Sequence, residues 1–128
     1  MIKILESEGY IILLKSVEII INIIKAGLIE LNEGQQHPFL QQLIDDGSVT
    51  KLVELFKLKK LDMAHFKIAQ MLSMIYKSSP LQLEIGENVI DQLKVHNDYK
   101  GLEFLAECQQ NNSLILSNGF EKQLFSDF

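Results

Sequence analysis

The chain repeats a short pattern at intervals of about 40 residues, and this periodicity restricts the fold more than any other feature. An aliphatic pair, polar residues and a glycine, with a leucine five residues after the glycine, occur three times. The glycines are Gly9, Gly47 and Gly119, which lie 38 and 72 residues apart, so the second interval is twice 36. A weaker copy surrounds Gly86, near the position that regular spacing requires. Such a period predicts a solenoid, in which each unit buries its apolar face against its neighbours.

The isoleucine-rich segment over residues 10–31 favours a helix over a strand. Its polar residues Lys15, Glu18, Asn22 and Lys25 are spaced so that they share one side of an α-helix. The β-branched run of isoleucines would also suit a buried strand, but strand periodicity does not explain the polar spacing. We therefore predict a helix with a narrow polar stripe that neighbours otherwise mostly cover.

Capping residues divide the next part of the chain into helices. Pro38 suits the first turn of a short helix over 39–45, which Gly47 ends. Ser48 is expected to cap a second helix, and Asp62 is expected to cap a longer third helix.

The C-terminal half is expected to continue in the same way. Pro80 ends the long helix and is expected to open another short one. Further amphipathic helices are predicted over about 89–95 and 102–108, followed by a break at the polar residues 111–113. Since no hairpin dipeptide lies between alternating apolar runs, we predict an all-α chain.

Residues 38–78 contain three features in a fixed order. A short first helix ends at Gly47, a second helix reads Leu-Val-Glu-Leu-Phe over 52–56, and a long third helix ends in Leu-Ser-Met-Ile over 72–75. This unit resembles an armadillo repeat, whose second helix has a Leu-Val-x-Leu-Leu core and whose third helix ends in Leu-Ser-Asn-Ile. A weaker resemblance extends over 80–111.

The resemblance implies a single domain over 1–128, folded as a right-handed α-α superhelix of the armadillo or HEAT type. It would contain about three repeats, partial at both ends, over approximately 1–36, 37–79 and 80–112, with a fragment over 113–128. In this family the third helices line a concave groove that holds extended peptides.

The same resemblance indicates which side chains would line the groove. Importin-like members hold the peptide backbone with tryptophan and asparagine, but Gln70 and Met74 stand at those positions here. Binding of nuclear-import cargo is therefore not expected, and only the general scaffold role carries over. The groove residues that we expect are Gln70, Met74, Glu103 and Glu107, with His65 and Lys67 at the rim.

No pattern of catalytic or metal-binding residues emerges from the sequence. His37, His65 and His96 lie 28 and 31 residues apart, without a second ligand one helical turn away, so we expect surface or capping histidines. Phosphate-binding glycine loops and nucleophile elbows are also missing from the sequence. We therefore expect no enzymatic activity, no metal and no cofactor.

Charge and cysteine content restrict the partners and the compartment. The formal net charge is −5, and all twelve basic residues are lysine, which disfavours nucleic acid. Within the segment over 10–31, Lys15, Glu18 and Lys25 carry charges that would be costly inside a membrane. The single cysteine, Cys108, cannot form an internal disulfide, so we expect a reducing compartment, the cytoplasm or alternatively the nucleus.

We therefore expect a non-enzymatic scaffold that binds a peptide or protein in its groove. Two like charges one helical turn apart, Glu103 and Glu107, favour a basic partner. The alternative is a structural fragment of a longer helical-repeat protein or regulatory subunit, which self-associates through apolar ends. The apolar residues at the C-terminal end are Phe120, Leu124, Phe125 and Phe128.

Overall fold

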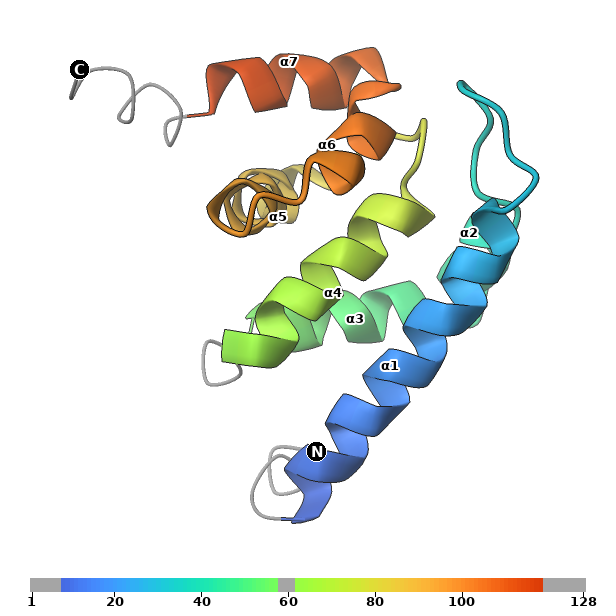
Figure 1. Cartoon of the computed structure of the whole chain (residues 1–128), viewed down its shortest axis with the longest axis vertical. Coiled ribbons are helices and arrows are strands. Elements are labelled where there is room, and N and C mark those ends of the chain that lie inside the picture. Colours follow the sequence, from blue (N-terminus) through green and yellow to red (C-terminus); the bar gives the residue numbers. More distant parts are fainter. Residues whose placement is uncertain (1–7, 58–61, 119–128) are drawn as a thin grey trace, which may run out of the picture.

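The computed structural model describes residues 8–57 and 62–118, with side chains for 15–57 and 65–118. Every regular element in these two segments is a helix, which confirms the predicted all-α class (Figure 1). The helices are α1 (Glu8–Leu28), α2 (Leu40–Asp45), α3 (Ser48–Lys57), α4 (Asp62–Ile75), α5 (Leu83–Val95), α6 (Tyr99–Ala106) and α7 (Gln109–Ser117).

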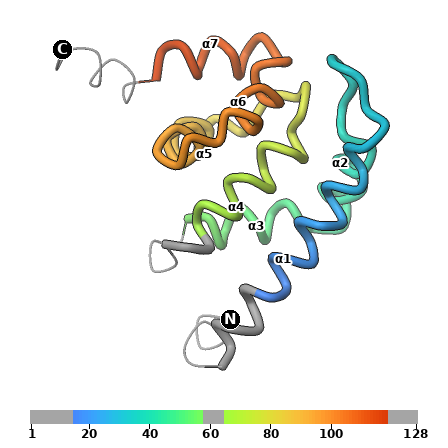
Figure 2. The backbone as a smooth tube through the Cα atoms, in the orientation of Figure 1, coloured from blue at the N-terminus to red at the C-terminus, as the bar shows by residue number. Residues whose placement is uncertain are grey.

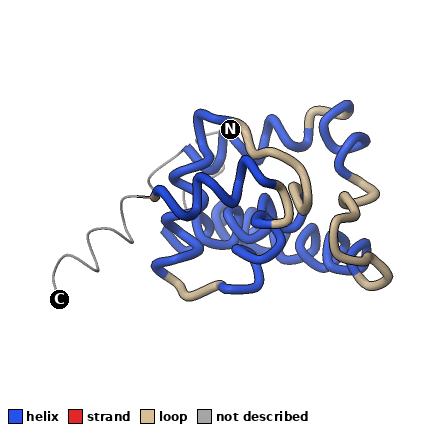
Figure 3. Tube along the Cα trace, turned by 90° about the horizontal axis from the view of Figure 1, so that it is seen from above, coloured by secondary structure: helices blue, strands red, loops and turns tan. Residues whose placement is uncertain are grey.

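Helix α4 lies at the centre of the arrangement. It contacts α1, α3, α5 and α6, while α7 packs on α5 and α6 (Figures 1 and 2). Helices α1, α4 and α6 therefore form a row of neighbours, with α4 in the middle. The longest connection between described helices, residues 29–39, joins α1 to α2 (Figure 3).

The core is built around α4 because this helix is apolar on nearly all sides. Ile68, Met71, Leu72 and Ile75 are fully buried in it, as expected for a helix with neighbours on several faces. Side chains of the surrounding helices complete one continuous cluster, which includes Ile24, Phe56, Ile90, Leu93 and Leu105.

Helix α1 departs from the expected coverage. Its polar stripe is exposed as predicted, and Val17, Ile21 and Ile24 are buried against the rest of the molecule. However, Ile19 and Ile23 are 62% and 54% exposed, so the prediction that neighbours cover the apolar remainder was wrong. These isoleucines are exposed because α1 lies at the end of the row of helices (Figure 1).

No helix in the described part of the chain is long and apolar enough to cross a membrane.

The predicted break at residues 111–113 was wrong, because α7 runs through it. Asn111 is 2% exposed, and its side chain accepts a hydrogen bond from the Leu81 backbone N–H at 2.9 Å. The same side chain donates to the Ser79 carbonyl at 2.6 Å. An asparagine that would favour a turn in isolation is therefore held within a helix by tertiary hydrogen bonds. The expected repeat boundary between residues 112 and 113 falls inside α7.

The short helix expected after Pro80 was also wrong. Residues 79–82 have no regular structure, and two of their backbone groups bond Asn111 instead of each other. Helix α5 then begins at Leu83, earlier than predicted. Helix α6 begins earlier than predicted because Asp98 caps it, accepting from the Gly101 N–H at 3.1 Å, and it ends at Ala106, two residues before the predicted end.

The predicted turn at Gly47 between α2 and α3 is confirmed, but the prediction that Ser48 caps α3 was wrong. Gly47 follows α2 with a φ of +84°, a left-handed conformation that favours glycine. Ser48 belongs to α3 itself, and its backbone N–H donates to Asp46 Oδ1 at 2.8 Å. The side chain of Asp46, and not that of Ser48, therefore accepts a backbone N–H at the start of α3. The Asp62 side chain and the four apolar C-terminal residues Phe120, Leu124, Phe125 and Phe128 lie outside the described part.

Candidate binding groove

Two adjoining pockets lie beside α6, the first between α1, α4 and α6 and the second between α6 and the 29–39 connection, and we refer to them together as the groove. The first has a volume of about 330 Å³ and the second about 490 Å³. They share Lys100 and Phe104 of α6. The first pocket is lined by Lys25, Leu28, Gln70, Ser73, Met74, Asp98, Lys100, Gly101 and Phe104.

The first pocket has an apolar base because α4 and α6 approach closely there. Met74 is only 6% exposed, and Leu28 and Phe104 are half-buried beside it. Gly101 permits the approach, since a Cβ on it would lie 2.9 Å from Ser73 Oγ and 3.1 Å from a methyl group of Leu93. A larger residue at Gly101 would therefore separate the two helices that form the pocket.

The polar wall of the first pocket is fixed by Asp98. Its Oδ1 accepts the Gly101 N–H, and its Oδ2 accepts a hydrogen bond from Gln70 Nε2 at 3.3 Å. This carboxylate thus connects α4 to the start of α6. The ammonium groups of Lys25 and Lys100 belong to exposed residues at the edge of the pocket.

The second pocket lies over a buried ion pair. Lys77 Nζ is 2.7 Å from Glu107 Oε1, and the two side chains are 5% and 13% exposed. Lys77 also donates to the carbonyl oxygens of Asn32 and Gln35, each at 2.8 Å. The ion pair therefore ties the 29–39 connection to the ends of α4 and α6. The pocket is lined by Leu31, Glu33, Lys77, Lys100, Glu103, Phe104, Ala106 and Glu107.

Glu107 has enough donors to remain ionised despite its burial. Its Oε1 also accepts from the Gly34 backbone N–H at 2.8 Å and from the Ser78 hydroxyl. Burial raises the pKa of the Glu107 carboxyl, but these hydrogen bonds and the charge of Lys77 outweigh it and leave the pKa below its ordinary value. The charge of Glu107 is thus neutralised within the protein.

Four of the six residues expected in the groove do line it. Gln70 and Met74 lie in the first pocket, and Glu103 and Glu107 lie in the second. Glu103 is the exposed one of the two acids, with its side chain 70% exposed and 3.7 Å from Lys100 Nζ.

The two expected rim residues lie elsewhere. His65 stacks on the Phe56 ring of α3, with ring centroids 4.1 Å apart. Lys67 lines neither pocket.

Sequence reasoning missed several groove residues. Lys100 and Phe104 could have been found from helical spacing, because Lys100 pairs with Glu103 and its Nζ lies 5.3 Å from the Phe104 ring centroid. Lys77 offered no such signal, since its partners are 30 to 45 residues away in the sequence.

His37 is a buried structural residue of the 29–39 connection, so of the two expectations, a surface or a capping histidine, the surface position was wrong for it. It is 3% exposed; its Nδ1 accepts the Phe39 N–H at 3.0 Å, and its Nε2 lies 2.8 Å from the Ile24 carbonyl oxygen. These partners require a neutral ring with the proton on Nε2. Gly27 makes room for the ring, since a Cβ there would lie 2.6 Å from His37 Cε1. Burial lowers the pKa of His37, and the bond to Ile24 opposes this in part.

Among the residues that the structure describes, no group of three or more metal-ligating side chains comes together. Comparisons with known proteins add no assignment: no family model, no curated protein and no solved structure matches the chain.

Proposed function

We propose that this chain is an armadillo-like scaffold that binds an extended peptide segment of a partner protein in the groove. The observation that carries the proposal is the groove itself, which runs from α1 and α4 along α6 to the 29–39 connection and contains Gln70, Met74, Glu103 and Glu107. Helix α4 is the third helix of the predicted unit 37–79, and a right-handed superhelix would align it with its counterparts along one concave face.

A role in binding is favoured because the buried polar groups of the groove already have structural partners. Asp98 holds Gly101 and Gln70, and Glu107 Oε1 accepts from Lys77, from the Gly34 N–H and from the Ser78 hydroxyl. Side chains held in this way shape a surface and are not free to transfer protons. An apolar base with a few fixed polar groups is typical of recognition sites.

The partner segment that we propose is basic at the second pocket. Glu33 and Glu103 are exposed acids there, and the ion-pair partner of Glu103 is the equally exposed Lys100, at 3.7 Å. The charge of Glu107, in contrast, is compensated by the buried Lys77. The attraction first expected from the pair Glu103 and Glu107 is therefore assigned to Glu33 and Glu103. Complementary charge at a rim acts mainly on the association rate and on the choice of partner.

The test is selection from a random peptide library, followed by titration of lysine-rich and glutamate-rich peptides by fluorescence anisotropy. We expect Glu103→Lys to weaken binding of lysine-rich peptides by about two- to tenfold, since one exposed charge contributes modestly. Glu54→Lys on α3 makes the same charge change at an exposed position outside the groove and is the matched control. If no peptide is enriched, or if both variants bind alike, the proposal fails.

A second candidate is a structural piece of a longer helical array. The observation that favours it is the exposure of Ile19 and Ile23 at the α1 end of the row, where another unit could continue the stack. A second copy of the chain could cover the same face.

A further inference from the structure

A line of small and aliphatic side chains runs along the uncovered side of α1. Ser16, Ile19, Ile23 and Ala26 follow one another at intervals of three, four and three residues, so they share one edge of the helix. All four are exposed, Ile19 by 62% and Ile23 by 54%. We call these four residues the α1 seam. Intervals of this kind are typical of helices that pack along a partner helix.

The seam is complementary to itself when reversed. If a second α1 lies antiparallel with its centre opposite residue 21, Ile19 faces Ile23 of the second copy and Ser16 faces Ala26. Large residues then meet large residues and small ones meet small ones. A two-fold axis produces each of these contacts twice, as isologous interfaces require.

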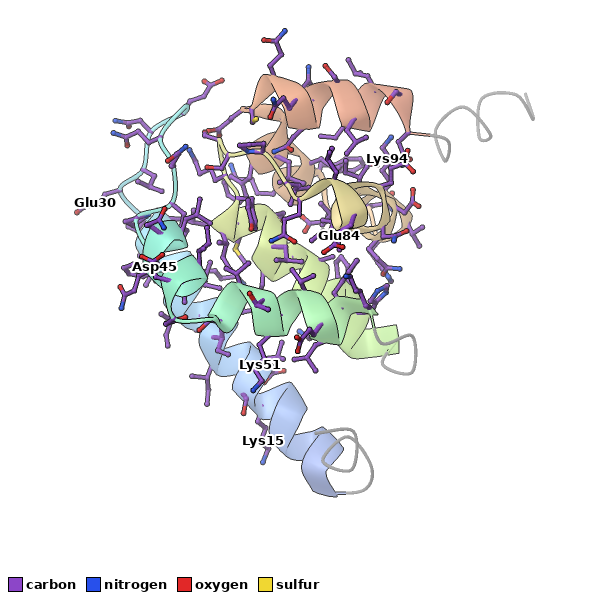
Figure 4. All side chains as sticks on the ribbon, turned by 180° about the vertical axis from the view of Figure 1, so that it is seen from behind. Lys15, Glu30, Asp45, Lys51, Glu84 and Lys94 are labelled. Atoms are coloured by element: carbon purple, nitrogen blue, oxygen red, sulfur yellow. The ribbon has the colours of Figure 1, made fainter. Side chains whose placement is uncertain are left out.

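The flanks of the seam select the antiparallel orientation. Ile20, 36% exposed, lies on one flank, and Lys15 and Asn22 lie on the other. In an antiparallel pair each flank meets its own counterpart, so Ile20 packs against Ile20 and Asn22 lies near Asn22. A parallel pair would instead set Ile20 against the polar flank. Lys15, which Figure 4 shows on the stretch of α1 beyond α3, meets no second lysine in the antiparallel arrangement.

We propose that α1 forms an antiparallel homodimer through this seam, independently of the function proposed for the groove. The residues that α1 contributes to the groove, Lys25 and Leu28, lie on the other side of the helix. From Ser16 to Ala26 the seam extends about 15 Å, at roughly 1.5 Å per residue. The dimer is therefore concentration-dependent, because so short a seam buries less than a standard interface.

Sedimentation equilibrium of the full chain over a wide concentration range tests the proposal. The mass is expected to rise from 14.6 kDa toward twice that value as the concentration increases. Ile19→Glu combined with Ile23→Glu should abolish the increase, because four carboxylates would then meet in the interface. Leu83→Glu, at a 94% exposed position on α5, is the matched control and should dimerise normally. Circular dichroism verifies that each variant is helical.

Disulfide trapping in a Cys108→Ser background tests the orientation without weakening the seam. With a mild copper oxidant, we expect Ile19→Cys alone to cross-link much less than a mixture of Ile19→Cys and Ile23→Cys. A mixture of Ile19→Cys and Ile23→Cys should cross-link, because these positions face each other only in the antiparallel pair. Efficient cross-linking of Ile19→Cys alone would indicate a parallel pair and overturn the proposal. A monomer at every concentration, or a dimer that is insensitive to Ile19→Glu with Ile23→Glu, would overturn it equally.

Discussion

At the scale of single residues, His37 shows how one buried ring joins two parts of the chain. Its ring bonds the end of α1 through the Ile24 carbonyl and the start of α2 through the Phe39 N–H. Both bonds together require the neutral form, because protonation of Nδ1 would turn an acceptor into a donor facing another donor. The stability of the fold should therefore depend on the protonation of this ring.

We predict that the free energy of unfolding decreases as the pH falls below 6.5. The pKa of His37 is lowered in the folded chain, so between that lowered value and 6.5 the unfolded state binds more protons and is favoured. Urea denaturation at several pH values measures this. His37→Gln should remove most of the slope in that window, and His96→Gln, at an exposed histidine, should retain it. Equal slopes in both variants would contradict the assignment.

The ion pair of Lys77 and Glu107 gives a second prediction at this scale. Lys77→Met leaves Glu107 charged and buried without its cation, so we expect a loss of about 3 kcal/mol or more in the free energy of unfolding. Lys57→Met removes an exposed ion pair with Glu84 and should cost less than about 1 kcal/mol. Chemical denaturation of both variants measures the difference. A cost for Lys77→Met no larger than for Lys57→Met would show that the buried pair does not hold the 29–39 connection.

At the scale of elements, sequence patterns predicted helices well where local signals decide the structure. The spacing of polar residues in α1 and the glycine after α2 are local, and both are confirmed. The C-terminal half depends instead on a tertiary contact. Asn111 resembles a turn residue in sequence, yet its amide is satisfied by backbone groups about 30 residues away, so α7 continues through it.

We predict that α7 depends on this contact. Asn111→Ala leaves the Leu81 N–H and the Ser79 carbonyl buried without their partner, and we expect a loss of about 2–3 kcal/mol in the free energy of unfolding. Asn112→Ala, an exposed neighbour in the same helix, should change it by less than about 0.5 kcal/mol. Urea denaturation compares the two, and amide hydrogen exchange in α7 shows whether the loss is local. Similar costs for both variants would contradict a special role for Asn111.

At the scale of the whole molecule, sequence patterns predicted four residues that line the two pockets but not how these side chains are used. Gln70, Met74, Glu103 and Glu107 line the groove because α4 packs directly against α6. Met74 is mostly buried and Glu107 is bound to Lys77, which no helical spacing reveals. Tertiary partners far apart in sequence determine which groove side chains remain free for a ligand.

The two surfaces of α1 give a last prediction. The groove uses Lys25 and Leu28, and the seam uses Ile19 and Ile23, so the two faces share no side chain. Ile19→Glu with Ile23→Glu should abolish dimerisation and leave the affinity for a selected peptide unchanged. Glu103→Lys should weaken the peptide and leave the sedimentation mass unchanged. Because the sites share no partner, we expect each free-energy change to persist when all three substitutions are combined. The change in the free energy of dimerisation and the change in the free energy of peptide binding should each stay within about 0.5 kcal/mol of the value in the separate variants. Coupling larger than this, measured by peptide titration at low and high protein concentration, would mean that dimerisation reshapes the groove through α1.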